Sequence, residues 1–233
     1  MLLLGIDFET TGLDPQNASI IEIGAVLYCP YFKSVVQSFS ILTSAEEVPE
    51  EITALTGISL ELLQANGVPL DKAFDSLERF ASKASLLVAH NADFEKSFIQ
   101  AKRPKSPLLE MQTLDTMTDI PYPPHVRHRD LERLSIGHNC VNSTYHRALP
   151  DVMTMFSVMS RYEWDDIMAY FVSPTREVQA LVAYENNHLA KECSFQWNPD
   201  AKKWLKKVKD LDMEALKKKA DEIGLKIAVD YTA

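Results

Sequence analysis

Runs of apolar residues divide the first half of the chain into strand-like and helix-like segments. The runs at 2–9, 20–28 and 34–42 have the length and composition of strands. Short helical segments follow at 49–57 and 59–67, each ending in glycine. In the next segment, 71–84, the apolar positions repeat at helical spacing: Ala73, Phe74, Leu77, Phe80 and Ala81.

Strands and helices alternate through the following residues. A short buried strand is predicted at 85–91, a helix at 92–102 and a strand at 108–116. A proline-rich loop at 119–129 leads to a helix at 130–138 and a last long helix at 146–163. Strands that first form hairpins and then alternate with helices predict a mixed sheet covered by helices.

The pattern restarts near residues 173–177. The segments at 178–184, 185–194, 195–198, 202–208, 212–224 and 225–230 give the order β-α-β-β-α-β. This order is consistent with a compact ferredoxin-like module. We therefore predict two domains, at 1–172 and 176–233, of which the second is a small α+β module.

Composition and charge support this division. No run approaches the ~20 apolar residues that a membrane span needs. Three widely spaced cysteines show neither zinc spacing nor a disulfide framework, which favours a reducing compartment such as the cytoplasm. The chain has a net charge of -9, but the acidic excess lies before residue 175, whereas lysines are dense at 202–209 and 217–219. Different charge balances predict different tasks for the two domains.

Two acids occupy the end of the first predicted strand. Asp7 and Glu9 are two positions apart, so their side chains share one face of that strand. Two carboxylates at the end of a buried strand repel one another and lose hydration. A compensating cation is therefore expected.

Further polar residues lie at other predicted element ends. Asp93 comes at a helix start after a strand, and His146 lies five residues before Asp151 at the start of the last long helix. Each has an ordinary alternative: a helix cap for Asp93, a loop position for His146, and a favourable dipole interaction for Asp151. Pro150 is compatible with a first helical turn.

Taken together, these segments resemble the DEDDh branch of the DEDD 3′–5′ exonuclease superfamily. The resemblance rests on Asp-x-Glu, then Asn-x-Asp-Phe, then His-x-Ala-x-x-Asp in this order, and on ETTGLD, ALTGIS, LVAHNADFEKSF, TLDT and HRAL. It covers about residues 1–165 and includes similarity to exonuclease X and to epsilon-type proofreading exonucleases. It implies an α/β, RNase H-like fold: a mixed five-stranded sheet flanked by helices.

The resemblance also implies a two-metal site for Mg²⁺, with Mn²⁺ as a substitute. Asp7, Glu9, Asp93 and Asp151 would hold the ions, and His146 would be the general base. Hard oxygen ligands suit these ions, and an ordinary histidine titrates near pH ~6.5, suited to that role. Substrate contacts would come from Phe8, Thr10, Leu13, His90 and Asn91, although Leu13 also fits a simple turn and His90 and Asn91 also fit a pinned turn.

Three functions follow as expectations. The first is a metal-dependent 3′–5′ exonuclease that acts on DNA, at a single strand or a 3′ overhang, and releases nucleoside 5′-monophosphates. The second is an exoribonuclease, because the cleaved phosphodiester is the same. The third is a non-catalytic nucleic-acid-binding or recruiting protein.

Two further acids near these segments are expected to have structural roles only: Glu95 on a helix surface, and Asp115 in a turn or cap.

The second domain contains the aromatic and basic segment FQWNPDAKKW. Phe195, Trp197 and Trp204 could stack on bases while the nearby lysines meet phosphates. Alternatively, the tryptophans are the core of a small domain and the lysines a solvated face. The module is thus expected to bind nucleic acid, or else a partner protein.

Overall fold

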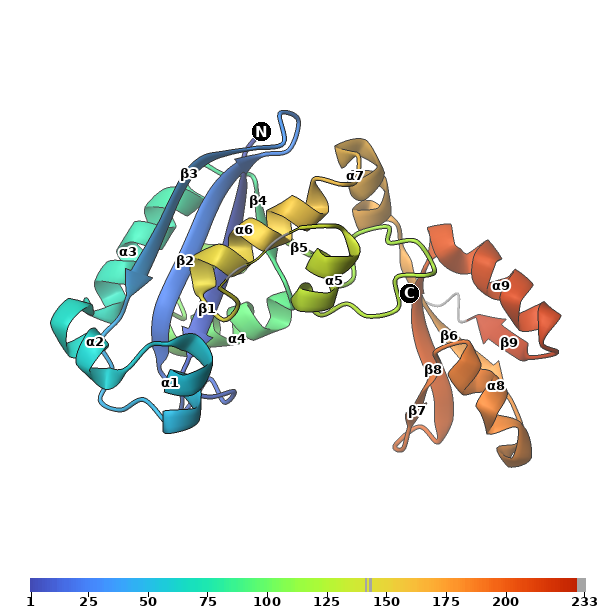
Figure 1. Ribbon diagram of the computed structural model, residues 1–233. Coiled ribbons are helices and arrows are strands. Elements are labelled where there is room, and N and C mark those ends of the chain that lie inside the picture. Colours follow the sequence, from blue (N-terminus) through green and yellow to red (C-terminus); the bar gives the residue numbers. More distant parts are fainter. Residues whose placement is uncertain (141, 143, 230–233) are drawn as a thin grey trace. The chain divides into compact units, whose positions relative to one another are not determined.

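A computed structural model describes residues 1–140, 142 and 144–229 of the chain (Figure 1). It contains two compact units, Met1–Ile167 and Met168–Ala233. The division falls inside α7 (Trp164–Val172), a helix that the sequence pattern did not predict. The sequence had placed the boundary between residues 172 and 176.

The first unit is built on a five-stranded mixed sheet. Its strands are β1 (Leu3–Thr10), β2 (Ile20–Cys29), β3 (Ser34–Leu42), β4 (Leu86–Ala89) and β5 (Thr113–Asp115), in the order β3-β2-β1-β4-β5. β2 pairs antiparallel with β1 and β3, whereas β4 pairs parallel with β1 and β5. The predicted RNase H-like mixed sheet flanked by helices is confirmed.

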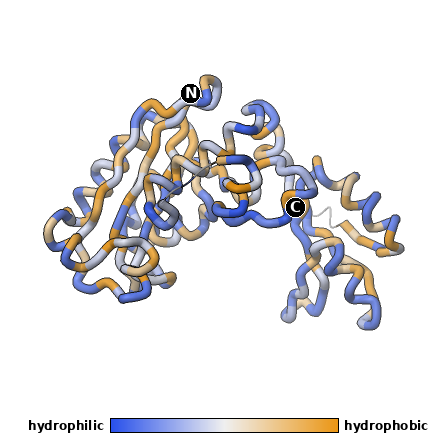
Figure 2. The backbone as a smooth tube through the Cα atoms, viewed as in Figure 1, coloured by the Kyte–Doolittle hydropathy of each residue, from blue (hydrophilic) through white to orange (hydrophobic). Residues whose placement is uncertain are grey.

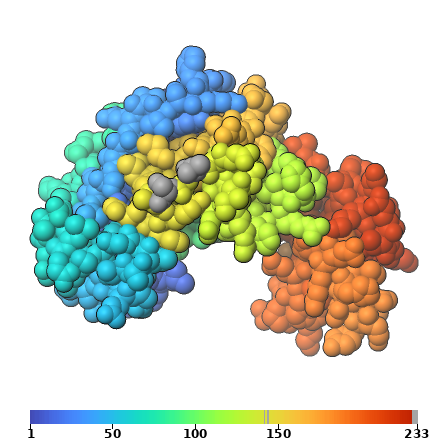
Figure 3. All heavy atoms as spheres, viewed as in Figure 1, coloured from blue at the N-terminus to red at the C-terminus, as the bar shows by residue number. Residues whose placement is uncertain are grey.

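Helices cover both faces of this sheet. Alternate residues of β1, such as Leu4 and Ile6, face a core shared with α3 (Leu70–Ala81) and α4 (Ala92–Lys102). The opposite face packs against α6 (Ala148–Met159), which lies in front of β1 and β2 in Figure 1 and covers them in Figure 3. The two faces of β1 therefore have different neighbours, which decides where its acids point.

A glycine lets α6 approach the sheet closely. A Cβ atom on Gly24 of β2 would lie 2.4 Å from the backbone carbon of Ala148, at the first residue of α6. Real Cβ atoms do not come so close, so only glycine fits. This contact fixes the start of α6 against the middle of β2.

The remaining elements of the first unit are short. α1 (Glu50–Thr56) and α2 (Leu60–Asn66) end at Gly57 and Gly67, as predicted. α5 (Leu131–Gly137) follows the proline-rich loop. The predicted strand at 108–116 is largely wrong: its first half is the 3₁₀ helix η1 (Pro107–Glu110), because Pro107 follows Ser106, whose side chain caps Leu108 N–H.

The second unit has the predicted β-α-β-β-α-β order. Its elements are β6 (Thr175–Leu181), η2 (Tyr184–Asn186), α8 (Asn187–Glu192), β7 (Gln196–Asn198), β8 (Lys203–Lys209), η3 (Asp210–Asp212), α9 (Met213–Glu222) and β9 (Lys226–Val229). The antiparallel sheet has the order β7-β8-β6-β9. Hydrophilic and hydrophobic stretches alternate along α9, as in an amphipathic helix (Figure 2). Residues 230–233 of the predicted module, including the end of its last strand, lie outside the described residues.

Across the described part of the chain, the structure contains no helix with the length and apolar character to cross a membrane.

Candidate active site

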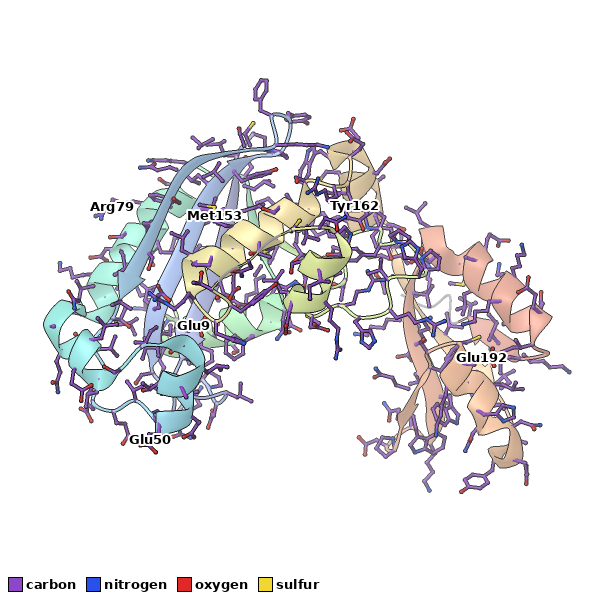
Figure 4. The ribbon with its side chains drawn as sticks, in the orientation of Figure 1. Glu9, Glu50, Arg79, Met153, Tyr162 and Glu192 are labelled. Atoms are coloured by element: carbon purple, nitrogen blue, oxygen red, sulfur yellow. The ribbon has the colours of Figure 1, made fainter. Side chains whose placement is uncertain are left out.

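Three of the predicted acids meet where β1 ends beneath the first turn of α6. Asp7 and Glu9 project from the α6 face of β1, and Asp151 comes from α6 itself. One carboxylate oxygen from each lies within 4.8 Å of the other two. Glu9 is labelled in Figure 4 beside the start of α6. Clustered carboxylate oxygens at this spacing are a donor set for a hard divalent cation.

The cluster is electrostatically costly without a cation. Burial, together with the charges of Glu95, Glu9 and Asp151, raises the pKa of Asp7 well above its usual range. Burial and the charge of Asp151 raise the pKa of Glu9 to about 8. Burial is also the main cause that raises the pKa of Asp151. At neutral pH the metal-free site therefore retains protons that a bound cation would displace.

A further buried acid, Glu95, interacts with this cluster, whereas the predicted ligand Asp93 is exposed. Glu95 is only 2% exposed, and among the neighbouring charges it contributes most to the raised pKa of Asp7. Its own pKa is raised well above the usual range, mainly by burial. The expectation that Glu95 lies on a helix surface is wrong. Asp93 is exposed, and neither Asp93 nor Glu95 is among the three acids whose oxygens lie within 4.8 Å of one another.

Helical periodicity explains why Glu95 is buried while Asp93 is exposed. α4 buries Ala92, Glu95, Phe98 and Ile99, a stripe that contacts the sheet. Asp93 lies one position beyond Ala92 and therefore points away from that stripe. Sequence reasoning missed Glu95, although the apolar spacing of its neighbours was a signal for its burial.

A second buried acid, Glu22 on β2, fixes the start of α6. It is 1% exposed and directly opposite Glu9 in the β1–β2 pairing. Its carboxylate accepts hydrogen bonds from Arg147 Nε and Nη2, both at 2.9 Å, and from Ala148 N–H at 3.1 Å. Despite burial, these bonds lower the pKa of Glu22, so it remains ionised. This ion pair joins β2 to the helix that carries Asp151. Its sequence signal was an acid inside the apolar run IIEIGAV.

His146 lies next to the acids but outside their cluster. Its backbone has a φ of 60°, and its N–H donates to Asp151 Oδ2 at 3.0 Å. The other Asp151 oxygen accepts from Asn142 Nδ2 at 2.8 Å. The His146 residue is exposed. The backbone thus holds Asp151 while leaving the imidazole accessible. As predicted, Pro150 lies in the first turn of α6.

The predicted substrate-contacting residues of β1 and the following turn separate into two groups. The Phe8 side chain is 4% exposed and packs edge-on against Phe74, because residues alternate faces along β1, so only the Phe8 backbone is open to a substrate contact. Thr10 is buried, and its hydroxyl donates to Gly12 O at 2.7 Å. Leu13 is 85% exposed beyond this turn. This exposed leucine in the turn after β1 is available for contact with a ligand.

His90 and Asn91 have mainly structural contacts. His90 Nδ1 lies 2.9 Å from Thr116 Oγ1, and burial lowers the pKa of His90. Asn91 has a φ of 72° and donates its N–H to Asp115 Oδ1 at 3.0 Å. Asp115 Oδ2 accepts from Ala92 N–H at 3.2 Å. The predicted cap role of Asp115 is confirmed: it caps α4 from strand β5 and thereby helps to place Glu95.

The structure thus combines an RNase H-like sheet with three carboxylates clustered where the first strand ends, an arrangement that could hold a divalent cation. The chain belongs to the DEDD 3′–5′ exonuclease family: a family model described as exonuclease (RNase T) matches residues 4–159. A second model, described as a domain of unknown function, matches residues 176–223.

Curated relatives agree with this assignment. The DNA polymerase III subunit epsilon of Treponema pallidum is 31% identical over 162 residues, 66% of this chain and 74% of that protein. The PolC-type DNA polymerase III of Caldanaerobacter subterraneus subsp. tengcongensis is 39% identical over 113 residues, 48% of this chain. That aligned region spans only 8% of the PolC-type polymerase.

Solved structures share the fold. Exonuclease X in complex with 5′ overhanging duplex DNA matches with a TM-score of 0.52 and 21% identity, over 72% of this chain and 91% of that chain. Exonuclease I matches with a TM-score of 0.69 and 13% identity, over 97% of this chain and 68% of that chain. At these identities the matches establish the fold alone.

Proposed function

We propose that the chain is a metal-dependent 3′–5′ exonuclease, with DNA as the favoured substrate and nucleoside 5′-monophosphates as products. The observation that carries this proposal is the convergence of Asp7, Glu9 and Asp151, with oxygens within 4.8 Å of one another, beside the buried Glu95. Four carboxylates with raised pKa values are a donor set for two Mg²⁺ or Mn²⁺ ions.

The proposed roles follow from these positions. Bound divalent metal would stabilise the attacking and leaving oxygens of the phosphodiester. Asp7, Glu9, Glu95 and Asp151 would hold the metal. The exposed imidazole of His146 would accept the proton of the attacking water, as a general base must. The backbone N–H of His146 keeps Asp151 oriented meanwhile.

The exposed turn after β1 would contact the terminal nucleotide. Leu13 is an exposed apolar side chain that could pack against a base, and the Thr10 backbone lies at the end of the strand that carries the acids. Arg147 and Glu22 would act only by positioning α6.

DNA is favoured because the named relatives are DNA polymerase III epsilon and PolC-type polymerases. The second candidate, an exoribonuclease, is supported by one structural neighbour, described as a 3′-exonuclease that recognises the 3′ end of a histone mRNA stem-loop. That neighbour has a TM-score of 0.56 and covers 70% of this chain. Reaction at the phosphate is common to both candidates, so a direct comparison is needed.

The test is a gel assay with 5′-labelled single-stranded DNA and RNA of matched sequence, run with Mg²⁺, Mn²⁺ or EDTA. We expect ladders that shorten from the 3′ end, only with metal, and faster for DNA. The Asp7→Ala variant should give no ladder. Faster shortening of RNA would favour the exoribonuclease. Binding without shortening of either polymer would refute the catalytic proposal and favour a recruiting protein.

A further inference from the structure

Two tryptophans form a cross-strand pair in the second unit. Trp197 on β7 is directly opposite Trp204 on β8, with ring centroids 5.7 Å apart and planes inclined by 60°. β7 is an edge strand, and half of the Trp197 surface is exposed. An indole with this exposure loses much of the free energy that burial would give.

The core of the unit does not require Trp197. That core is formed by residues of β6, β8, α8 and α9, together with Phe195 and with Trp204 at its margin. Phe195 is only 3% exposed, so the prediction that it stacks on a base is wrong. The alternative that both tryptophans form the core thus fails for Trp197, whereas Trp204 packs at the margin of the core. An exposed tryptophan outside the core is a candidate for ligand contact.

The tryptophan pair borders a cavity of about 390 Å³. This volume lies in the range of small-ligand sites. Its lining combines the two indoles with Gln179, the end of β6, the following residues to Ala183, and two lysines, Lys202 and Lys203. No carboxylate is among these lining residues. The cavity therefore lies between the two indoles, the end of β6 and the turn that carries the two lysines.

Not every lysine of the segment contributes to this surface. Lys206 Nζ is turned inward and donates to Cys193 O at 2.9 Å, so its predicted phosphate contact is not supported. Lys202 and Lys203, in contrast, are exposed at the turn between β7 and β8. Lys191 Nζ lies 6.0 Å from the centre of the Trp204 ring and adds positive charge on that side.

We propose that this surface, Trp197 with Trp204, Lys202 and Lys203, binds single-stranded nucleic acid, with a base stacked on Trp197 and phosphates beside the two lysines. Aromatic platforms flanked by cations bind single strands without reading their sequence. A polyanion also matches the local charge, whereas the residues before 175 have an acidic excess. This second contact goes beyond the proposed exonuclease site, which lies in the other unit.

The test measures binding by the full chain in EDTA, where metal-dependent cleavage cannot occur. Anisotropy of 5′-fluorescein-labelled (dT)20 gives the Kd for the wild type, Trp197→Ala and Trp197→Phe. We expect Trp197→Ala to weaken binding about tenfold, and Trp197→Phe to retain most of it. Phe32→Ala is the matched control, because Phe32 is an 83% exposed aromatic residue of the first unit. Unchanged circular dichroism would show that Trp197→Ala is folded.

The lysines are tested by the salt dependence of the same Kd. Loss of one phosphate contact to a single strand makes the negative slope of log K against log salt concentration shallower by about 0.7. We expect this for Lys203→Gln but not for Lys218→Gln, an exposed lysine on α9 outside the cavity lining. Blunt duplex DNA should show no dependence on Trp197, since its bases are stacked internally.

Two outcomes would overturn the proposal: a Kd of folded Trp197→Ala within twofold of the wild type, or an equal loss in Phe32→Ala. Either would favour a protein partner for the tryptophan surface. The result is independent of the exonuclease proposal. A wild type that binds (dT)20 through Trp197 but shortens no oligonucleotide with Mg²⁺ would retain this site and refute only the catalytic function.

Discussion

Removing one carboxylate from the acidic cluster should stabilise the metal-free protein. In Glu9→Gln, the side chain keeps its shape but loses a charge that lies within 4.8 Å of both Asp7 and Asp151 oxygens. Two unit charges at that distance repel by on the order of 3 kcal/mol at an effective dielectric constant of about 20. The substitution therefore removes an unfavourable interaction rather than a favourable one.

The size of the effect follows from the pKa of Glu9, which rises from 4.5 to about 8 in the folded protein. Between these values the folded protein holds a proton that the unfolded chain releases. The free energy of unfolding therefore falls as the pH rises through this window. The upper limit of this loss is about 5 kcal/mol. Because Glu9 is only half-buried, solvent screening reduces the expected loss to about 2 kcal/mol.

The assay is thermal unfolding in EDTA at pH 5 and pH 8. At pH 8 we expect Glu9→Gln to melt about 4–8 °C above the wild type. At pH 5, where Glu9 is protonated in the folded protein, the two should melt together. Glu47→Gln is the control, because Glu47 is exposed in the same unit. Millimolar Mn²⁺ should raise the melting temperature of the wild type at pH 8 and reverse the order. A variant less stable than the wild type at pH 8 in EDTA would refute this reasoning.

Three further predictions concern the placement of the acids. Glu95→Gln should lower the rate of metal-dependent 3′-shortening at least 100-fold, whereas Asp93→Asn should change that rate less than threefold. The gel assay distinguishes the two variants, and equal losses of activity would contradict the assignment of Glu95. Arg147→Met removes the ion-pair partner of the buried Glu22, so urea unfolding at pH 7 should show a free energy of unfolding lower by about 3 kcal/mol. The control is Arg133→Met at an exposed ion pair, which should lower the free energy of unfolding by less than about 1 kcal/mol. Gly24→Ala should lower both the melting temperature and the exonuclease activity, because the added Cβ atom would displace the start of α6. A variant with normal activity would show that α6 can shift without moving Asp151.

Local periodicity in the sequence was sufficient for part of the site. Asp7 and Glu9 share a face because strand residues alternate, and this holds whatever packs against them. The acid in the first turn of α6 was also predicted from the sequence, because it lies at the start of the last long helical segment, where Pro150 is tolerated. The β-α-β-β-α-β order of the second unit followed from the same periodicities.

Only the tertiary structure decided which neighbours those residues meet. Asp93 and Glu95 are two positions apart on α4, and the docking of that helix on the sheet buries Glu95 and exposes Asp93. Glu22 acquires its partner Arg147 from a point 125 residues further along the chain.

The same distinction applies to the aromatic segment of the second unit. Packing buries Phe195 and leaves Trp197 half-exposed, although the two lie only two positions apart in the same motif. Periodicity determines the face of an element on which a side chain lies. Whether that face meets the core, a distant charge or solvent depends on long-range packing, which the local pattern does not contain.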